Sequence, residues 1–207
     1  MRLVLASQSP SRRMLLEQGG VRPVLRPAHL DEDAVVATLG DVSPAETVAA
    51  LARAKASTVV GEFPDDVVVG CDSMLLLNDE LLGKPHTVDE TIRRWKAQRG
   101  KQAQLLTGHA VSYRGEWVVD TVATTIRFGE VSDADIEAYA RSGQPLECAG
   151  AFTLEALGSW FIDSIDGDPT SVIGLSMPLL RRILYRFGLD ASDFWEPEKK
   201  YSSYTDR

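Results

Sequence analysis

Residues 3–20 have the sequence LVLASQSPSRRMLLEQGG, in which a short apolar run leads directly into a helix start. The β-forming residues 3–6 predict a buried strand. Ser9 is suited to cap free backbone amides and Pro10 has its φ preset, so a helix is expected from there to the glycine pair at 19–20. A strand followed at once by a helix is a building unit of α/β proteins.

Arg12 and Arg13 fall in the first turn of this helix, where the helix dipole is already positive. Cations at exposed positions there are disfavoured by roughly 0.3–1 kcal/mol each. A bound phosphate would convert this penalty into an attraction, because free amides, hydroxyls and arginines converge at the helix start. The alternative, equally compatible with the residues alone, is that both side chains point into solvent.

The chain has 207 residues, 44% hydrophobic and 25% charged, so it can bury the core of one globular domain or of one domain with two lobes. No apolar run approaches the ~20 residues of a membrane span, and the start lacks a signal-peptide pattern. Cys71 and Cys148 are too few for a disulfide scaffold, so a cytoplasmic location is expected. The net charge of −8 argues against stable nucleic-acid binding.

Helix and strand signals alternate along the rest of the chain. Capping boxes begin helices at Ser43 and Thr87, and further helices are expected from Ser132 and over 178–187. Strands are expected over 21–27, 67–71, 74–77, 80–82, 104–113, 117–128 and 160–165, with turns at 78–79 and 114–115. Together they predict an α/β domain with a mixed sheet over residues 1–195, followed by a polar, flexible tail at 196–207.

Two acidic positions could hold a divalent cation. His29 precedes Leu30-Asp31-Glu32-Asp33, whose carboxylates suit a hard cation such as Mg²⁺, although a solvated acidic loop that caps the next segment is the commoner outcome. Asp72 is expected at the end of the apolar strand 67–71, where α/β sheets usually place ligands. There it could bind a metal, activate water as a general base or cap a turn. Cys71 is expected to be a buried small hydrophobe, since nothing nearby would activate it.

Lys55 and Lys84 are compact cations suited to a phosphate oxygen. Lys55 projects from a helix whose other face is apolar, and Lys84 follows the predicted hairpin. Each lysine taken alone is more often an ordinary surface residue. The sequence contains no G-x-x-x-x-G-K-[ST], G-x-G-x-x-G or H-E-x-x-H motif, so the usual nucleotide motifs are excluded.

Eight segments, taken in order, match one known pattern in spacing over nearly the whole chain. They are LASQSPSRRMLL at 5–16, LDE at 30–32, LARAKA at 51–56, VVGCDSM at 68–74, LLGKP at 81–85, LLTGHAV at 105–111, CAGAFTLEALGSWFI at 148–162 and IDGDPTSVIGLSMPLL at 165–180. This pattern resembles the Maf family. The form CDSM and the run 163–180 are most similar to actinobacterial members.

The resemblance implies a nucleoside triphosphate pyrophosphatase, which cuts between the α- and β-phosphates to give a nucleoside monophosphate and pyrophosphate. It implies an α/β fold with an elongated mixed sheet flanked by helices, and two lobes around a deep cleft, as in the inosine triphosphatases. It also implies a divalent cation (Mg²⁺, Mn²⁺ or Co²⁺), frequent homodimers, and removal of non-standard nucleotides with a link to septum formation and cell division.

The resemblance also assigns roles by position. Asp72 matches the family's catalytic acid, described as the proton acceptor, and Glu32 matches its acidic partner at the metal site. Arg12 is favoured over Arg13, because family members often differ at the latter position. The polar and basic positions that line the family's phosphate site are matched by Ser7, Ser9, Arg12, Lys55 and Lys84.

Three further positions bear on the base of the substrate. Ser11 stands where the thymidine/uridine branch has Arg and the 7-methyl-guanosine branch has Trp, and Ser73 stands where they have Thr or Gln. Glu155 matches the methyl-guanosine branch and can accept both edge hydrogens of guanine. The first two positions fit neither branch, so the base stays open.

Two alternatives to this enzyme remain at this point. One is a nucleotide-binding regulator of cell division that keeps the pocket but turns over weakly or not at all. The other is a phosphatase or nucleotide hydrolase with a different cleavage site. The intact acidic pair and lysines favour the pyrophosphatase, since a mere binder need not keep metal ligands.

Overall fold

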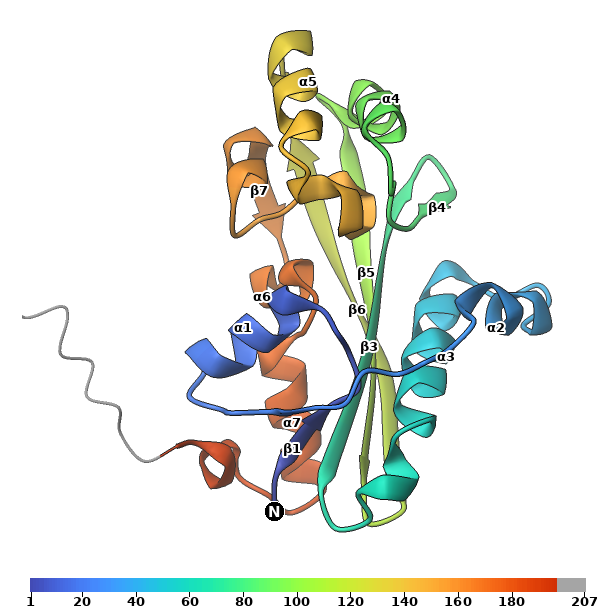
Figure 1. Cartoon of the computed structure of the whole chain (residues 1–207), viewed down its shortest axis with the longest axis vertical. Helices are drawn as coiled ribbons and strands as arrows, with labels where there is room; N and C mark the ends of the chain where they lie inside the picture. The colour runs from blue at the N-terminus through green and yellow to red at the C-terminus, as the bar shows by residue number, and fades with distance from the viewer. Residues whose placement is uncertain (197–207) are drawn as a thin grey trace, which may run out of the picture.

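The computed structural model describes residues 1–196 and is built on one seven-stranded sheet (Figure 1). The strand order is β2-β1-β3-β5-β6-β7, with β4 paired to β3. The strands are β1 (Leu3–Leu5), β2 (Val24–Leu25), β3 (Val67–Leu77), β4 (Glu80–Leu82), β5 (Gln102–Tyr113), β6 (Glu116–Phe128) and β7 (Ile162–Asp166). Strand β1 is parallel to β2 and β3 and the other pairs are antiparallel, so the predicted mixed sheet is confirmed.

Seven α-helices flank the sheet within the described residues. They are α1 (Pro10–Gln18), α2 (Glu32–Thr38), α3 (Pro44–Ser57), α4 (Val88–Gln98), α5 (Asp133–Arg141), α6 (Pro169–Ile173) and α7 (Met177–Arg186). Figure 1 shows α2 and α3 on one side of the sheet and α1, α6 and α7 on the other, with α4 and α5 at one end. No helix among residues 1–196 has the length and apolar character needed to span a membrane.

Local sequence signals place most helix starts correctly. Ser43 and Glu46 form the predicted capping box at α3, and the Thr87 side chain caps α4. Ser9 caps α1 by accepting from the Arg12 amide, with Pro10 at the first helical position. Each cap satisfies an amide that would otherwise lack a partner in the first turn.

Glycines in β3 and β5 let α3 lie directly on the sheet. A Cβ at Gly108 would lie 2.2 Å from the Val48 carbonyl oxygen, and one at Gly70 would lie 2.4 Å from the Ala52 oxygen. Asp72 pairs with Gly108 across the antiparallel ladder and therefore faces α3 as well. Since successive strand residues point to opposite faces, Ser73 faces the side of α1, α6 and α7.

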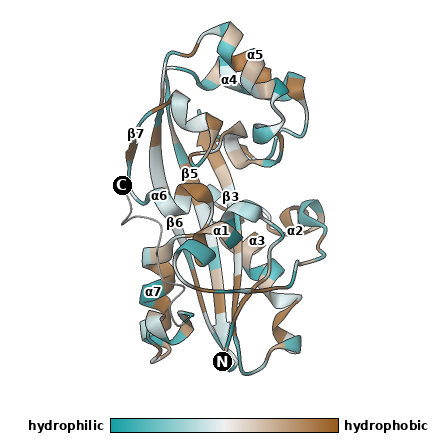
Figure 2. Cartoon of the chain, turned by 60° about the vertical axis from the view of Figure 1, so that its left-hand side comes forward, coloured by the Kyte–Doolittle hydropathy of each residue, from teal (hydrophilic) through white to brown (hydrophobic). Residues whose placement is uncertain are grey.

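The apolar core is divided along the sheet. Val68 and Ala110 belong to a cluster under α3, while Leu5 and Leu180 belong to one that joins the opposite face to α1 and α7. A separate cluster lies under α4 and α5 around the buried Trp95, whose ring packs edge-on against Phe128 at 5.5 Å between centroids. Helix α7 contributes apolar residues to the apolar core, and Figure 2 shows that it carries both apolar and polar residues. The two lobes and the deep cleft between them stay predictions.

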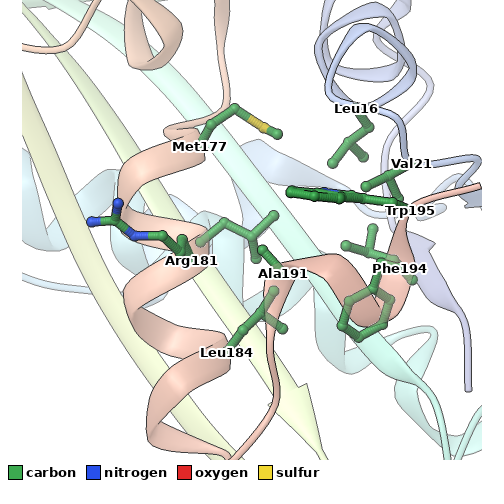
Figure 3. Close-up of a pocket in the computed structure, with 10 residues that line it drawn as sticks. Leu16, Val21, Met177, Arg181, Leu184, Ala191, Phe194 and Trp195 are labelled. Atoms are coloured by element: carbon green, nitrogen blue, oxygen red, sulfur yellow. The ribbon is translucent and has the colours of Figure 1, made fainter.

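The last described residues pack against α1 and α7. The 3₁₀ helix η5 (Ala191–Phe194) and Trp195 close a small apolar cavity of about 40 Å³ (Figure 3). The Trp195 ring extends across this cavity toward Met177, and Trp195 forms a β-bridge with Val21. This lining holds no cluster of polar groups, so the cavity serves packing.

The predicted end of a strand at Asp72 is wrong. Strand β3 continues to Leu77, because Ser73 and Met74 stay in the ladder opposite Thr107 and Leu106. Asp72 therefore lies within the strand. Asp72 ends the apolar run in the sequence, but β3 continues beyond it because the following residues stay hydrogen-bonded to β5.

The acidic segment at 31–33 caps the next element, as one of its two interpretations predicts, since Asp31 caps α2 and Glu32 and Asp33 lie in the first turn of that helix. Other strand boundaries differ from those expected. The expected strand at 21–27 is limited to β2, and the one expected from residue 160 begins at Ile162 after a 3₁₀ helix (Leu157–Phe161). The hairpin turns at 78–79 and 114–115 are confirmed, with positive φ at every turn residue. Of the predicted tail, residues 197–207 lie outside the described part.

We predict that Gly108→Ala destabilises the fold. The added methyl group would meet the backbone of α3, which cannot move without disturbing the core beneath it. Overpacking of this kind costs about 1–3 kcal/mol in the free energy of unfolding, measurable by urea denaturation. Gly61→Ala is the control, because nothing lies within 4 Å of its added Cβ and no change is expected. Equal stability of the two variants would contradict the prediction.

Candidate active site

Residues 70–74 of β3 have no strand partner on one side within the described chain. Strand β1 pairs with β3 only as far as Val69, and β4 pairs only from Leu75 onward. Strand β5 runs along the other side of β3 throughout this stretch. We call residues 70–74 the open edge of β3. The candidate site residues of the N-terminal half gather around this edge.

On the α3 face of the open edge, one lysine joins the two predicted acidic residues. The Lys55 ammonium lies 2.6 Å from Asp72 Oδ1 and 2.9 Å from Glu32 Oε1. The Asp72 and Lys55 side chains are 8% and 13% exposed, so this pair is largely removed from water. Asp72 Oδ2 is buried and has no hydrogen-bond partner in the described structure. The acidic pair predicted from sequence is thus brought together.

On the opposite face, Arg12 is buried among neutral acceptors. Its Nε donates to the Gly174 carbonyl at 2.8 Å, Nη1 to Ser7 Oγ at 3.1 Å and Nη2 to Ser73 Oγ at 3.1 Å. No carboxylate lies within ion-pair distance of Arg12 among residues 1–196. The residue is only 9% exposed, so its positive charge is both buried and uncompensated.

Arg12 and Arg13 are adjacent in the first turn of α1, but their side chains point in different directions. Arg13 points outward and pairs with Glu17 at 2.7 Å on the exposed side of α1. Arg12 points inward to the sheet. Ser7 Oγ also accepts from the Ser9 amide at 3.2 Å, so the predicted serines and Arg12 form one hydrogen-bonded group at the start of α1.

Within residues 1–196, Lys84, Ser11 and Glu155 make no hydrogen bond or ion pair with either group. Lys84 lies beyond β4 and pairs with Glu147 at 3.2 Å in an exposed position. Glu155 is exposed and Ser11 partly buried. Lys84 and Glu155 both influence the Cys148 thiol. Burial and the Glu155 carboxylate raise the pKa of this thiol to about 11, and the Lys84 ammonium opposes the rise. Lys84 and Glu155 therefore lie on a common side of the molecule, although the structure does not join them to Asp72.

Cys71 precedes Asp72 in β3 and lies near both groups. Burial raises the pKa of its thiol to about 11, and Arg12 and Lys55 both act to lower it from opposite faces of the sheet. A thiol with this pKa is not a nucleophile at neutral pH. The expectation that Cys71 is a buried small hydrophobe is confirmed.

Sequence analysis named Ser7 and Ser73, two of the Arg12 acceptors, but missed Gly174 and the residues behind these acceptors. Ser73 Oγ is 3.0 Å from Thr107 Oγ1, which donates to the Ser171 carbonyl at 2.8 Å. His109 Nε2 accepts from the Ser176 amide at 2.8 Å. The signal was present in the segment LLTGHAV, where a threonine and a histidine interrupt an apolar strand at positions facing the same side.

Comparison with known proteins identifies the family of this chain. A sequence model of the Maf-like protein family matches residues 2–187. The chain belongs to the Maf family. A relative from Corynebacterium efficiens, named nucleoside triphosphate pyrophosphatase, is 63% identical over 195 residues that cover 94% of this chain and 99% of the relative.

Two other relatives carry the same name. The protein of Corynebacterium glutamicum is 60% identical over 195 residues, covering 94% of this Maf chain and 99% of the relative. The protein of Nocardia farcinica is 51% identical over 203 residues, covering 93% and 96%. These organisms are actinobacteria, as the motif resemblance indicates.

We predict an acid-sensitive contribution of His109 to stability. Burial and the nearby Arg12 lower the pKa of His109 to about 4, below the ordinary value of 6.5, while the Thr107 backbone and Asp168 oppose this. The unfolded chain therefore binds the proton first as the pH falls. The stabilisation is complete above about pH 6.5 and is lost between there and pH 4, by about 3 kcal/mol.

The measurement is the free energy of unfolding at pH 7 and at pH 4, compared between the wild type and His109→Gln. Glutamine can accept from the Ser176 amide and does not titrate. The free energy of unfolding of His109→Gln should therefore fall by about 3 kcal/mol less than that of the wild type between pH 7 and pH 4. Parallel pH curves for the two proteins would refute the assignment.

Proposed function

We propose that this chain hydrolyses nucleoside triphosphates between the α- and β-phosphates, releasing a nucleoside monophosphate and pyrophosphate. Its family and the shared name of its relatives support this reaction class. The open edge of β3 is the proposed reaction centre, with the phosphate tail on the Arg12 side and Asp72 beside the attacked phosphorus. Catalysis at Asp72 and phosphate binding by Ser7, Ser9, Arg12, Lys55 and Lys84 belong to this proposal.

The uncompensated charge of Arg12 is the observation that carries the proposal. A buried cation costs free energy unless an anion accompanies it. The guanidinium has five N–H donors, and three nitrogen–acceptor contacts leave donors available on both Nη atoms. The positive end of α1 adds to the same field. A phosphate oxygen is the ligand that both features favour.

The residues around Asp72 fit a divalent cation. The carboxylates of Asp72 and Glu32 already approach one shared positive group, the Lys55 ammonium, and Asp72 Oδ2 is buried without a donor. No group of three or more potential ligands occurs among residues 1–196, which suits Mg²⁺, since that ion often takes one or two carboxylates with substrate phosphates. Bound there, Mg²⁺, Mn²⁺ or Co²⁺ would polarise phosphoryl oxygens and offset negative charge.

Charge balance favours the same conclusion. In the protein alone, Lys55 is matched by Asp72 and Glu32, and Lys84 is matched by Glu147. A triphosphate brings up to four negative charges to a region in which Arg12 is the uncompensated cation. An accompanying divalent cation would reduce that mismatch without displacing the buried ion pair.

Asp72 has two distinct oxygens for its proposed task. Oδ1 is held by Lys55 at 2.6 Å, which orients the carboxylate, and Oδ2 stays available to accept a proton from the attacking water. Lys55 also lies close enough to this carboxylate to stabilise negative charge that develops beside it. Burial of the pair strengthens both effects, because little water screens them.

The base preference is proposed from Glu155, whose exposed carboxylate can accept two hydrogens from a guanine-like edge. Ser73 faces Arg12 and Thr107, so its contacts support the phosphate side and not the base. A cytoplasmic location, homodimer formation and the absence of stable nucleic-acid or membrane binding complete the proposal.

Neighbouring arginines provide a matched test of phosphate binding. We expect Arg12→Met to lower kcat/KM for a triphosphate substrate about 10–100-fold, since a charge-assisted contact is lost. Arg13→Met removes the same charge from the next residue but only an exposed ion pair, and should change kcat/KM by less than about twofold. Similar losses in both variants would argue for a general charge effect and against a phosphate contact of Arg12.

Product analysis and one substitution test the reaction itself. With Mg²⁺ and a panel of standard and modified triphosphates, we expect pyrophosphate and monophosphate in equal amounts. Asp72→Asn keeps the size of the side chain but cannot accept the proton, so kcat should fall at least about 10²-fold. Release of orthophosphate would indicate another cleavage site, and tight binding without any product would favour the regulator. Near-normal turnover of Asp72→Asn would remove its proposed role.

A further inference from the structure

His109 lies behind Arg12 on the same face of the sheet. It pairs with Cys71 across the β3–β5 ladder and is 1% exposed. Its Nε2 accepts from the Ser176 amide, so the acceptor nitrogen is directed at the junction between α6 and α7. The described structure gives no hydrogen-bond partner of good geometry for Nδ1. The one clear bond of this buried ring is therefore the bond to Ser176.

That junction carries the acceptor for Arg12. Gly174 ends α6 and Ser176 caps α7, so only one residue separates the carbonyl that holds Arg12 Nε from the amide that is held by His109. Gly174 has φ +126°, and a Cβ there would lie 3.2 Å from Arg12 Nε. The backbone of the junction is thus fitted closely to the guanidinium, and its placement depends on what fixes it to the sheet.

Two side chains of β5 make that attachment. Thr107 Oγ1 donates to the Ser171 carbonyl in α6, and His109 accepts from Ser176 at the start of α7. Thr107 fixes one end of the junction and also contacts Ser73, a second acceptor of Arg12. His109 fixes the other end. Its removal would free the Gly174 carbonyl while leaving the Ser7 and Ser73 contacts in place.

We infer that His109 is a positioning residue for the phosphate-binding Arg12, acting through the Ser176 amide and the Gly174 carbonyl. The inference rests on the proposed function, since it takes Arg12 as the group that contacts the phosphate tail. It adds a residue with no contact to substrate, on a different strand from Asp72. Its chemical requirement is a neutral acceptor at the position of Nε2.

The surroundings of His109 keep that acceptor available. Arg12 and burial lower the pKa of the imidazole to about 4, and Asp168 and the Thr107 backbone oppose this only in part. The ring is therefore neutral at physiological pH, with its Nε2 lone pair directed at Ser176. Arg12 and its anchor thereby support one another, because the guanidinium disfavours the protonated form of the ring that would lose the bond.

The test is a double-mutant cycle that measures the affinity for inorganic pyrophosphate with Mg²⁺ by calorimetry. His109→Leu keeps the volume and removes the acceptor, so it should weaken binding about tenfold in the wild-type background. In the Arg12→Met background, His109→Leu should weaken binding by less than about twofold, since the guanidinium that His109 positions is absent. His109→Gln, which restores an acceptor, should recover most of the affinity.

Ile136→Val is the control for general destabilisation. It lies in α5, in the core cluster around Trp95 at the end of the sheet away from α7, so it should lower stability without changing affinity. If His109→Leu does not fold, His109→Val takes its place in the cycle, because it also removes the acceptor and its β-branched side chain suits strand β5.

The outcomes separate the two proposals. If Arg12→Met leaves the pyrophosphate affinity unchanged, the phosphate-binding role of Arg12 is wrong and the positioning role falls with it. If Arg12→Met weakens binding but His109→Leu does not, or weakens it equally in both backgrounds, the positioning role alone is wrong. Failure of His109→Gln to recover affinity would also overturn the need for an acceptor.

Discussion

The antiparallel ladder between β3 and β5 determines where every group around the open edge lies. Because successive residues of a strand point to opposite faces, Asp72 faces α3 and Ser73 faces α1 and the α6–α7 junction. Lys55 and Arg12 are therefore held on two faces of one strand by neighbouring residues. A single ligand can reach both faces only where the strand edge is free. The interval between the end of β1 and the start of β4 supplies that place.

The two cations differ in what surrounds them, and the difference divides the work of the site. Lys55 is matched by carboxylates, so its free charge is small and its effect is to orient Asp72. Arg12 is surrounded by neutral oxygens and keeps its full charge in a buried position. The proposed function accordingly assigns phosphate binding to the start of α1 and proton transfer to the opposite face. A substrate with a reactive phosphorus and a charged phosphate tail matches this division.

Much of this could be predicted from the sequence, because the decisive signals are local. Ser9-Pro10, the capping box at Ser43 and the turn residues at 78–79 determine conformation within a few residues of themselves. Asp72 and Glu32, which the family resemblance assigns to one metal site, both contact Lys55, and their metal role stays a prediction. The strand end at Asp72 was wrong because pairing with β5, distant in sequence, overrides the local break in hydrophobicity.

The anchoring of Arg12 could not be predicted for the same reason. Its partners Gly174 and Ser73 lie 162 and 61 residues away in sequence, and no periodicity connects them. His109 is further removed, since its contribution depends on a carbonyl two residues from the amide that it binds. Contacts that span most of the chain are outside the reach of pattern analysis. They become visible only when the tertiary structure brings the segments together.

The other poorly exposed arginine contacts show why Arg12 is informative. Arg94, with a side chain 12% exposed, is paired with Glu90 at 2.7 Å, and Asp66, 10% exposed, is paired with Arg2 at 2.6 Å. The chain is rich in carboxylates, with a net charge of −8, so a partner for Arg12 was available in composition. Its three acceptors are neutral all the same. A departure from the pairing found for Arg94 and Asp66 lowers stability, and such departures are expected where function requires them. At Arg12, the requirement is an anion that the chain itself does not provide.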